Sequence, residues 1–333
     1  MIILIENNRL SFSPAVDLIT KTDFVKGLEI SLEIQLTEGY YIIVPSTYDP
    51  NQESMFQLNC YSSDCQINIE KIQDEPTSIF KGMWNGKTAG GCINYSTWRF
   101  NPQYLVTLTN KTTLRIQLDQ PQQGATSKFI GFYLIKGTLP QKRKILQLTK
   151  KDLIKNTEYS NLPSILLEVT LTVDQSPCIV IPSIFAPGAE GTFELSISGE
   201  GVEAKQLPED GWKEKVIKGE WKGPSSCGRI LADNKWKNNP RYPFSISNPA
   251  RISILLVQSD KEKSIGIGFY IFRQDNKGNM LPEPISKSGF VSSKEVLLEA
   301  VLEQGNYIVM PATYDPQQDD YFTLYIFSDQ VII

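Results

Sequence analysis

Two stretches near the ends of the chain are almost the same: YIIVPSTYDPNQESMFQLNCYS at residues 41–62 and YIVMPATYDPQQDDYFTLYIFS at residues 307–328. The offset of 266 residues (41 to 307) holds without a gap from Leu32 and Leu298 onward. A third, weaker copy, CIVIPSIFAPGAEGTFELSISG, spans 178–199. A match of this length does not arise by chance, so the chain is a repeat protein and its fold is that of the repeated unit.

The repeated unit contains further motifs in a fixed order. A Trp-x-Gly turn begins at Trp84 and Trp221, an Asn-Pro-x-Tyr motif follows at 101–104 and 239–242, and then come the strands IGFYLI at 130–135 and IGFYIF at 267–272. We therefore expect complete units over 76–200 and 205–333. Residues 1–65 align only with the second half of a unit. We expect one of three explanations: a partner chain supplies the preceding strands, the segment packs on the neighbouring unit, or the true chain begins earlier.

Apolar residues alternate with polar ones along several segments. The alternating sets are Leu114, Ile116 and Leu118; Ile252, Ile254 and Leu256; and Leu32, Ile34 and Leu36. A period of two is typical of half-buried antiparallel strands. Pro45, Pro182 and Pro311 are each expected to end a strand, because proline lacks the N–H that a sheet requires. The pattern predicts an all-β fold of tandem antiparallel β-sandwiches, two complete and one partial, with the aromatic residues of the repeated stretch in the core.

These motifs carry a resemblance to a known family. The run GMWNGKTAGGC at 82–92, followed by Asn101-Pro102-Gln103, Ile130-Gly131-Phe132 and VPSTY, resembles the C2-like β-sandwich of calpains, the domain that follows the protease core in that family. The second complete unit keeps most of these motifs but has PSSCG at 224–228, so it is a diverged copy. The resemblance covers nearly the whole chain and implies C2-like sandwiches; nothing in the chain resembles the papain-like core.

The family's sandwich usually carries an acidic loop that is proposed to sense calcium or lipid. The corresponding segments here, 118–129 and 257–264, are short and contain few acidic residues. Calcium prefers about six to eight converging oxygen ligands. We therefore expect weak or no calcium binding.

Composition excludes several function classes. The 333 residues contain no histidine, which removes histidine-dependent hydrolase dyads and histidine-ligated zinc. Five cysteines are an odd number in a long chain and are expected to be reduced thiols. The net charge of −4 gives no support for nucleic-acid binding. No run of roughly 18 apolar residues is present, and the opening MIILIENN is too short for a signal-peptide core. We expect no enzyme, no cofactor and a cytoplasmic location.

Three groups of residues are candidates for metal or phosphate sites. Asp315, Asp319 and Asp320, with Asp49 and Glu53 in the first copy, could ligate a cation, but they are better interpreted as solvated turn residues. Cys60 and Cys65 lack a second pair at zinc-ribbon spacing and are interpreted as structural thiols. Lys87, in a Gly-Lys-Thr sequence, lacks the rest of a phosphate-binding loop and is interpreted as part of a surface turn. No metal site is predicted.

The segment QKRKILQLTKKDLIK at 141–155 is the candidate binding site. Its basic residues are Lys142, Arg143, Lys144, Lys150, Lys151 and Lys155, against Asp152 alone. In an acidic chain such a segment can dock to an acidic protein surface or to anionic lipid. The alternative is an ordinary solvated connection. The second unit has RQDNKGNMLPEP at 273–284 in this place, so any site belongs to one unit.

Together these observations favour a non-catalytic intracellular scaffold or protein-binding component that is part of a larger assembly, with the cytoskeleton and the cilium as candidate places. The first alternative is a calcium- or phospholipid-dependent membrane-binding module, for which acidic loops should gather at one tip. The second is a regulatory fragment of a calpain-like cysteine protease, for which a Cys/His domain should precede the array.

Overall fold

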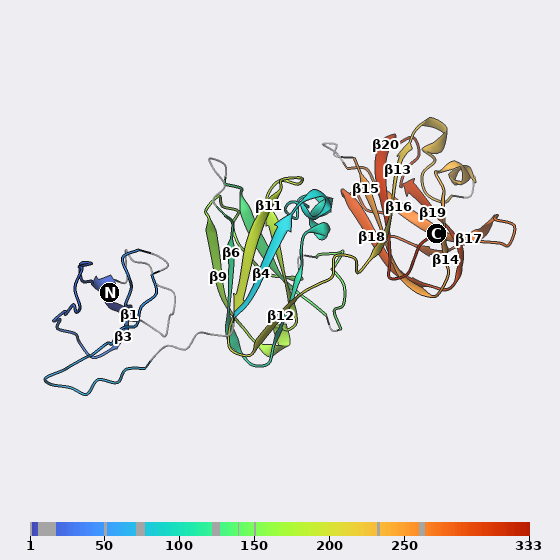
Figure 1. The fold of residues 1–333 in the computed structure, drawn as a ribbon. Helices are drawn as coiled ribbons and strands as arrows, with labels where there is room; N and C mark the ends of the chain where they lie inside the picture. Colours follow the sequence, from blue (N-terminus) through green and yellow to red (C-terminus); the bar gives the residue numbers. More distant parts are fainter. Residues whose placement is uncertain are drawn as a thin grey trace. The chain divides into compact units, whose positions relative to one another are not determined.

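The computed structural model describes residues 2–5, 18–49, 52–70, 77–121, 127–138, 140–149, 151–231, 234–259 and 264–333. It divides into two compact units, Met1–Ile72 and Gln73–Ile333 (Figure 1), here called unit 1 and unit 2. The strands of both units form antiparallel sheets, and the helical segments of the described residues are short 3-10 helices. The predicted all-β fold of tandem antiparallel sandwiches is confirmed.

The first sandwich of unit 2 packs a five-stranded sheet, in the order β12-β5-β10-β7-β8, against a four-stranded sheet, β4-β11-β6-β9. Its elements are β4 Thr77–Trp84, η1 Gly86–Thr88, η2 Ser96–Phe100, β5 Tyr104–Leu108, β6 Thr112–Asp119, β7 Ile130–Lys136, β8 Leu153–Asn156, β9 Ser164–Leu171, η3 Val173–Gln175, β10 Cys178–Ile184, β11 Gly191–Ser198 and β12 Val202–Gln206. Leu114, Ile116 and Leu118 of β6 are fully buried in its core, as their alternation predicts.

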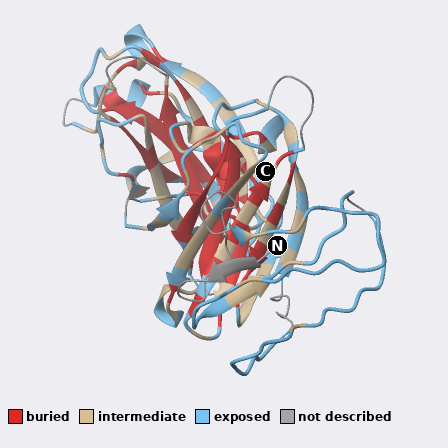
Figure 2. Ribbon diagram, turned by 90° about the vertical axis from the view of Figure 1, so that its left-hand side faces the viewer, coloured by how far each residue is buried: buried red, intermediate tan, exposed pale blue. Residues whose placement is uncertain are grey.

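The second sandwich repeats this plan with two four-stranded sheets, β13-β20-β15-β18 and β14-β19-β16-β17. Its elements are β13 Lys213–Trp221, η4 Gly223–Ser225, η5 Lys235–Asn238, β14 Tyr242–Ile246, β15 Ala250–Gln258, β16 Ile267–Gln274, β17 Met280–Lys287, β18 Glu295–Leu302, β19 Gly305–Thr313 and β20 Asp320–Ser328. Figure 2 shows that burial is concentrated on the strands of the sandwiches.

The Trp-x-Gly turn and the proline of the repeated stretch contact each other. The Trp84 indole donates to the Pro182 carbonyl at 3.0 Å, and Trp221 donates to Pro311 at 3.2 Å. These prolines lie inside β10 and β19, so the prediction that they end a strand is wrong. The reason is that β5 pairs with β10 only at 178–180, and β14 pairs with β19 only at 305–309. Beyond those residues the strand has a neighbour on one side only, where proline is tolerated.

The glycine of each Ile-Gly-Phe strand has a packing reason. A Cβ atom on Gly131 would lie 3.0 Å from the Tyr159 ring, and one on Gly268 would lie 2.9 Å from the Phe290 ring. In both sandwiches an aromatic ring therefore lies against the strand at this point. The repeated motif encodes a close approach of ring to backbone.

Unit 1 contains the three-stranded sheet β2-β1-β3, formed by β1 Ile2–Ile5, β2 Leu18–Thr20 and β3 Tyr40–Ile43. The order matches β8-β7-β10 and β17-β16-β19, as the repeat requires. The strand predicted around Leu32, Ile34 and Leu36 does not form, so that prediction is wrong. The counterparts of this segment and of 55–62 are β9 and β11, which in the first sandwich flank β6 and do not pair with each other. Among the described residues of unit 1 no strand corresponds to β6, and neither segment pairs into a sheet there.

Candidate protein-binding surface

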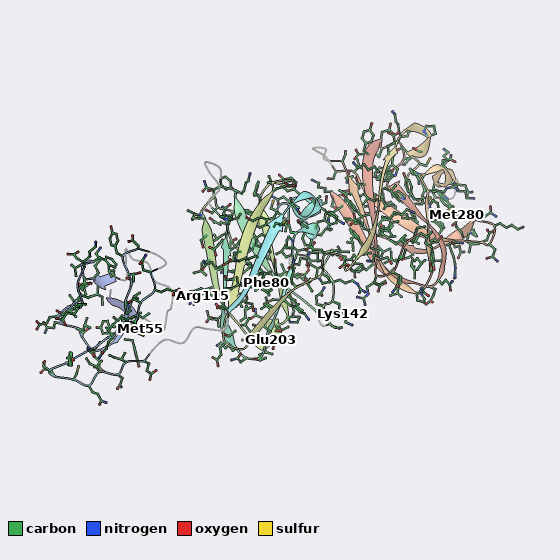
Figure 3. All side chains as sticks on the ribbon, in the orientation of Figure 1. Met55, Phe80, Arg115, Lys142, Glu203 and Met280 are labelled. Carbon is green, nitrogen blue, oxygen red and sulfur yellow. The ribbon has the colours of Figure 1, made fainter. Side chains whose placement is uncertain are left out.

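The structure divides the basic segment into two parts. Lys142, Lys151 and Lys155 are exposed on the first sandwich, and Lys142 is labelled in Figure 3. Lys150 lies outside the described residues. Arg143 and Lys144 contact other parts of unit 2, as described below. The exposed lysines keep the character expected of a docking site for an acidic partner, and whether they act as one stays a prediction.

Lys144 is bound within the chain. Its side chain is 6% exposed, and its Nζ donates to the Phe100 carbonyl at 2.9 Å and pairs with the Glu209 carboxylate. Burial lowers the pKa of the Lys144 ammonium, while Glu209 acts in the opposite direction. An ammonium that is buried and already paired is not available to an external partner.

Arg143 holds the connection between the two sandwiches. Its Nε donates to the Gly211 carbonyl at 2.8 Å, and its guanidinium lies 3.7 Å from the Asp329 carboxylate. The same guanidinium lies over the Trp212 ring, 5.4 Å from its centroid. Trp212 in turn donates to the Lys144 carbonyl at 2.9 Å. Two of the five described basic residues, Arg143 and Lys144, are thus used where the second sandwich follows the first.

Arg99 is the most buried charge of this junction, and no motif in the sequence marks it. It is 1% exposed; its Nε donates to the Leu146 carbonyl at 2.8 Å, and its Nη2 lies 2.6 Å from Glu295 of the second sandwich. Lys87 also crosses the junction, because it pairs with the Glu214 carboxylate. Both cations lie in the Trp-x-Gly to Asn-Pro segment, whose sequence predicted a turn and no interface.

An apolar cluster forms the centre of the junction. Its buried members are Leu146, Leu255, Val257 and Phe327, with Phe100, Trp212, Leu297 and Tyr325 partly buried around them. Leu255 and Val257 lie on the face of β15 opposite to Ile254 and Leu256, which face the core. The sequence signal was the unbroken apolar run ILLV at 254–257, since a strand buried on both faces does not alternate. An apolar centre with a charged rim is the anatomy of a specific interface.

The acidic residues of the repeated stretch hold turns. Asp319 accepts a hydrogen bond from the Gly223 amide at 3.1 Å, just as Glu190 accepts one from the Gly86 amide at 2.8 Å in the first sandwich. Asp315 lies 3.8 Å from Arg229. Asp320 is 4% exposed and accepts from the Tyr321 amide at 2.8 Å, so for this residue the expectation of a solvated side chain is wrong.

The described residues show neither a metal cluster nor a disulfide. Within the described ranges, no group of three or more histidine, cysteine, aspartate or glutamate residues is placed to hold a metal ion. All five cysteines are free thiols. None of the described helices has the length and apolar composition needed to cross a bilayer.

Comparison with known proteins identifies the family. The model of "Calpain large subunit, domain III" matches residues 6–61, 80–198 and 217–327. The chain is 38% identical over 327 residues to serine/threonine-protein kinase 4 homolog B of Dictyostelium discoideum, covering 95% of this chain and 29% of that protein. It is 26% identical over 307 residues to putative calpain-like cysteine protease A of the same organism, covering 86% of this chain and 47% of that protein. It is 26% identical over 306 residues to calpain-10 of Rattus norvegicus, covering 75% and 45%.

The chain therefore spans less than half the length of each of these relatives. The family-model match extends over the partial unit and both sandwiches, and no protease core is part of the match. The chain belongs to the calpain domain III family and carries that domain in repeated form.

Proposed function

We propose that this chain is a non-catalytic, protein-binding scaffold within a larger cytoplasmic assembly. The observation that carries the proposal is the junction of unit 2. Arg99, bonded to Glu295 across it, and Phe100 of the apolar cluster tie the first sandwich to the second in one defined arrangement. A fixed pair of sandwiches presents its outer surfaces at a constant distance and orientation, which is what a scaffold requires.

The relatives support a role outside catalysis. One is named a serine/threonine-protein kinase and another a calpain-like cysteine protease, and this array aligns with both. Phosphoryl transfer and peptide hydrolysis need unlike active sites. A region common to two such proteins is best explained as one that binds or positions, and we extend that role to this chain.

The exposed lysines supply a surface for a partner. Lys142, Lys151 and Lys155 extend from one segment of the first sandwich, and the chain is otherwise acidic. An acidic protein surface, for example on a cytoskeletal or ciliary component, would be attracted to them. Anionic lipid is the alternative partner, in line with the alternative function as a phospholipid-binding module.

Native capture with the tagged full chain tests the proposal. We expect a defined protein partner, identified by mass spectrometry, that is lost on changing Lys142, Lys151 and Lys155 to Glu. Changing the exposed Lys111, Lys205 and Lys277 to Glu is the matched control and should leave capture intact. Loss of capture with both variants would indicate charge-driven, non-specific binding and would count against the scaffold.

Two further assays separate the alternatives. Co-sedimentation with phosphatidylserine vesicles should show no calcium-dependent binding, and calorimetry should show no stoichiometric micromolar calcium site. The purified chain should also leave fluorogenic peptides uncleaved with calcium present. Cleavage that a thiol-alkylating reagent blocks, and that is lost on mutating one cysteine, would make the chain an enzyme and overturn the proposal.

A further inference from the structure

Most edge strands of unit 2 carry a feature that discourages pairing with a further strand. Shortness, proline, irregular register and charge are such features. Strands β8, β12 and β14 have four or five residues each, and β17 contains two prolines and two register shifts. Lysine is present in β4 and β13, and β18 contains Glu295 and Glu299. These edges are protected.

Strand β9, with the sequence SILLEVTL, is the exception among the described strands of unit 2. It is the edge of its sheet opposite to β4 (Figure 1), and within the described ranges it pairs with β6 alone. Its eight residues contain no proline or lysine and pair with β6 without a register shift. Its one charged residue, Glu168, lies 2.8 Å from Arg115 of β6. Nothing in this strand discourages a further strand.

The backbone of β9 alternates between the sheet and the free edge. The Gln120 amide donates to the Pro163 carbonyl at 2.8 Å, in the same register that pairs β6 with β9. Since hydrogen-bonded and non-hydrogen-bonded pairs alternate in an antiparallel ladder, the odd-numbered residues of β9 bond to β6. The N–H and C=O groups of Ser164, Leu166 and Thr170 therefore point to the free edge. In the described part of the chain, these three residues make no backbone hydrogen bond beyond the β6 ladder.

The side chains of β9 are incompletely covered. Ile165, Leu167 and Val169 pack against the first core but are only partly buried. On the outer face, Leu166 is 44% exposed. A strand added at this edge would cover apolar area that the sandwich itself leaves in contact with water.

We propose that β9 pairs with β9 of a second copy of this chain, so that their two four-stranded sheets join into one. The strands would run antiparallel about a twofold axis at Leu167. On the core face, Leu167 then lies opposite Leu167 of the second copy, and Ile165 lies opposite Val169. Apolar cross-strand pairs of this kind stabilise a sheet.

The outer face is compatible with the same register. Leu166 lies opposite Glu168 of the second copy, and Ser164 lies opposite Thr170, so no like charges face each other. A contact about a twofold axis uses the same surface on both copies and closes at the dimer. Both faces of the strand therefore fit a second copy as the partner.

The dimer goes beyond the scaffold function and does not depend on it. Two copies would present Lys142, Lys151 and Lys155 twice, which raises the avidity for a partner with repeated acidic sites. A monomeric variant that still captures the partner would leave the scaffold standing, so the two proposals fail separately.

Sedimentation velocity of the full chain over a range of concentrations tests the pairing. The unmodified chain should form a dimer. Leu166→Glu places a glutamate opposite Glu168 on each copy, and it should raise the dissociation constant of the dimer about tenfold or more. Leu166→Lys places a lysine opposite the same Glu168 and should retain the dimer. Circular dichroism should be the same for both variants, because Leu166 is on the exposed face of the strand.

Val301→Glu is the matched control, since Val301 is an exposed apolar residue on the edge strand β18 of the second sandwich. It should leave the dimer unchanged. A monomeric unmodified chain would overturn the proposal, and so would association that Leu166→Glu leaves intact. Equal weakening by the glutamate and lysine variants, or by Val301→Glu, would also overturn it, because the register predicts a difference.

A cross-linking experiment tests the register itself. In the full chain with Cys60→Ser and Cys65→Ser, oxidation of Leu167→Cys with copper phenanthroline should give a disulfide-linked dimer, because opposed residues of a non-hydrogen-bonded pair lie close enough for a disulfide. Glu203→Cys on the edge strand β12 is the control and should stay monomeric. Absence of the Leu167→Cys dimer, or an equal yield from Glu203→Cys, would exclude the pairing about Leu167.

Discussion

At the scale of single residues, the tyrosine of the Asn-Pro-x-Tyr motif is the least satisfied group in the first core. The Tyr104 ring packs against Phe80 and Phe193, and its side chain is fully buried. Its hydroxyl has no hydrogen-bond partner in the structure. Burial, and next the charge of Glu209, raises the pKa of Tyr104 well above its ordinary value. A buried hydroxyl without a partner costs stability.

We expect Tyr104→Phe to stabilise the protein by about 1 kcal/mol, because the substitution removes the unsatisfied hydroxyl and keeps the ring. The pH dependence has a definite sign. The raised pKa means that the unfolded state loses its tyrosine proton first, so stability falls as the pH rises above the ordinary value of 10.0. Urea unfolding measured at pH 8 and at pH 11 gives the free energy of unfolding at each pH. Its decrease between the two should be smaller for Tyr104→Phe than for the unmodified protein. Tyr242→Phe, at the repeat counterpart, is the control; an equal gain there would argue against the assignment.

Thiol reactivity follows burial. Burial raises the pKa of the Cys178 thiol to about 12, and Cys92 is also buried, whereas Cys65 is exposed. Since the thiolate is the reactive species, we expect alkylation at pH 8 to modify Cys65 within minutes and to spare Cys92 and Cys178 until the protein unfolds. Mass spectrometry of the digested protein gives the order. Early modification of Cys178 in folded protein would contradict the structure.

At the scale of elements, what the sequence could predict depends on how many faces of a strand are buried. Strand β6 alternates and was predicted from Leu114, Ile116 and Leu118, because only its inner face is covered. Strand β15 has the same inner alternation, but Leu255 and Val257 are buried on the outer face by the first sandwich. Periodicity reports the core within a unit. It does not show which outer faces of two sandwiches contact each other, because that contact depends on residue pairs distant in sequence, such as Arg99 and Glu295.

The same limit explains the basic segment. The excess of lysine and arginine at 141–155 is visible in the sequence, but only the fold shows that Arg143 and Lys144 are used at the junction. The counterparts of these residues in the second sandwich fall in a hairpin between β16 and β17, which has a different sequence. Local composition predicted a charged surface and could not divide it between internal and external partners.

The junction gives a test at this scale. We expect Arg99→Ala to destabilise unit 2 by about 2 to 3 kcal/mol. The substitution removes the guanidinium that pairs with the Glu295 carboxylate and donates a hydrogen bond to the Leu146 carbonyl. Calorimetry should then show two separate thermal transitions where the intact junction gives one. The counterpart Lys237 is exposed, so Lys237→Ala should change the free energy of unfolding by less than about 0.5 kcal/mol. Two transitions in the unmodified chain would mean that the junction does not couple the sandwiches.

At the scale of the whole molecule, the repeated unit forms complete sandwiches in unit 2 and only one three-stranded sheet in unit 1. Each sandwich of unit 2 has a central strand, β6 or β15, that joins the strands on either side of it into one sheet. Unit 1 has the three strands whose counterparts pair with one another, and they form its sheet. The alternating segments around Leu32 and Phe56 stay unpaired, and Phe56 is 72% exposed. Sequence similarity alone therefore does not give a sheet; the central strand is required.

The last prediction follows from this requirement. Expressed by itself, the segment 1–63 should aggregate or stay unfolded, because Leu32, Phe56 and Leu58 are exposed and burial of such side chains contributes about 25 cal/mol per Å². Residues 73–333 should fold, because both of their sandwiches contain the strand between β9 and β11 or between β18 and β20. Circular dichroism and size exclusion on both segments decide the matter. Adding a synthetic peptide of β6, residues 112–119, to segment 1–63 should increase its β-sheet signal, since β6 is the strand that pairs with both β9 and β11 in the first sandwich. A monomeric 1–63 segment that melts cooperatively without the peptide would show that the half unit needs no added strand.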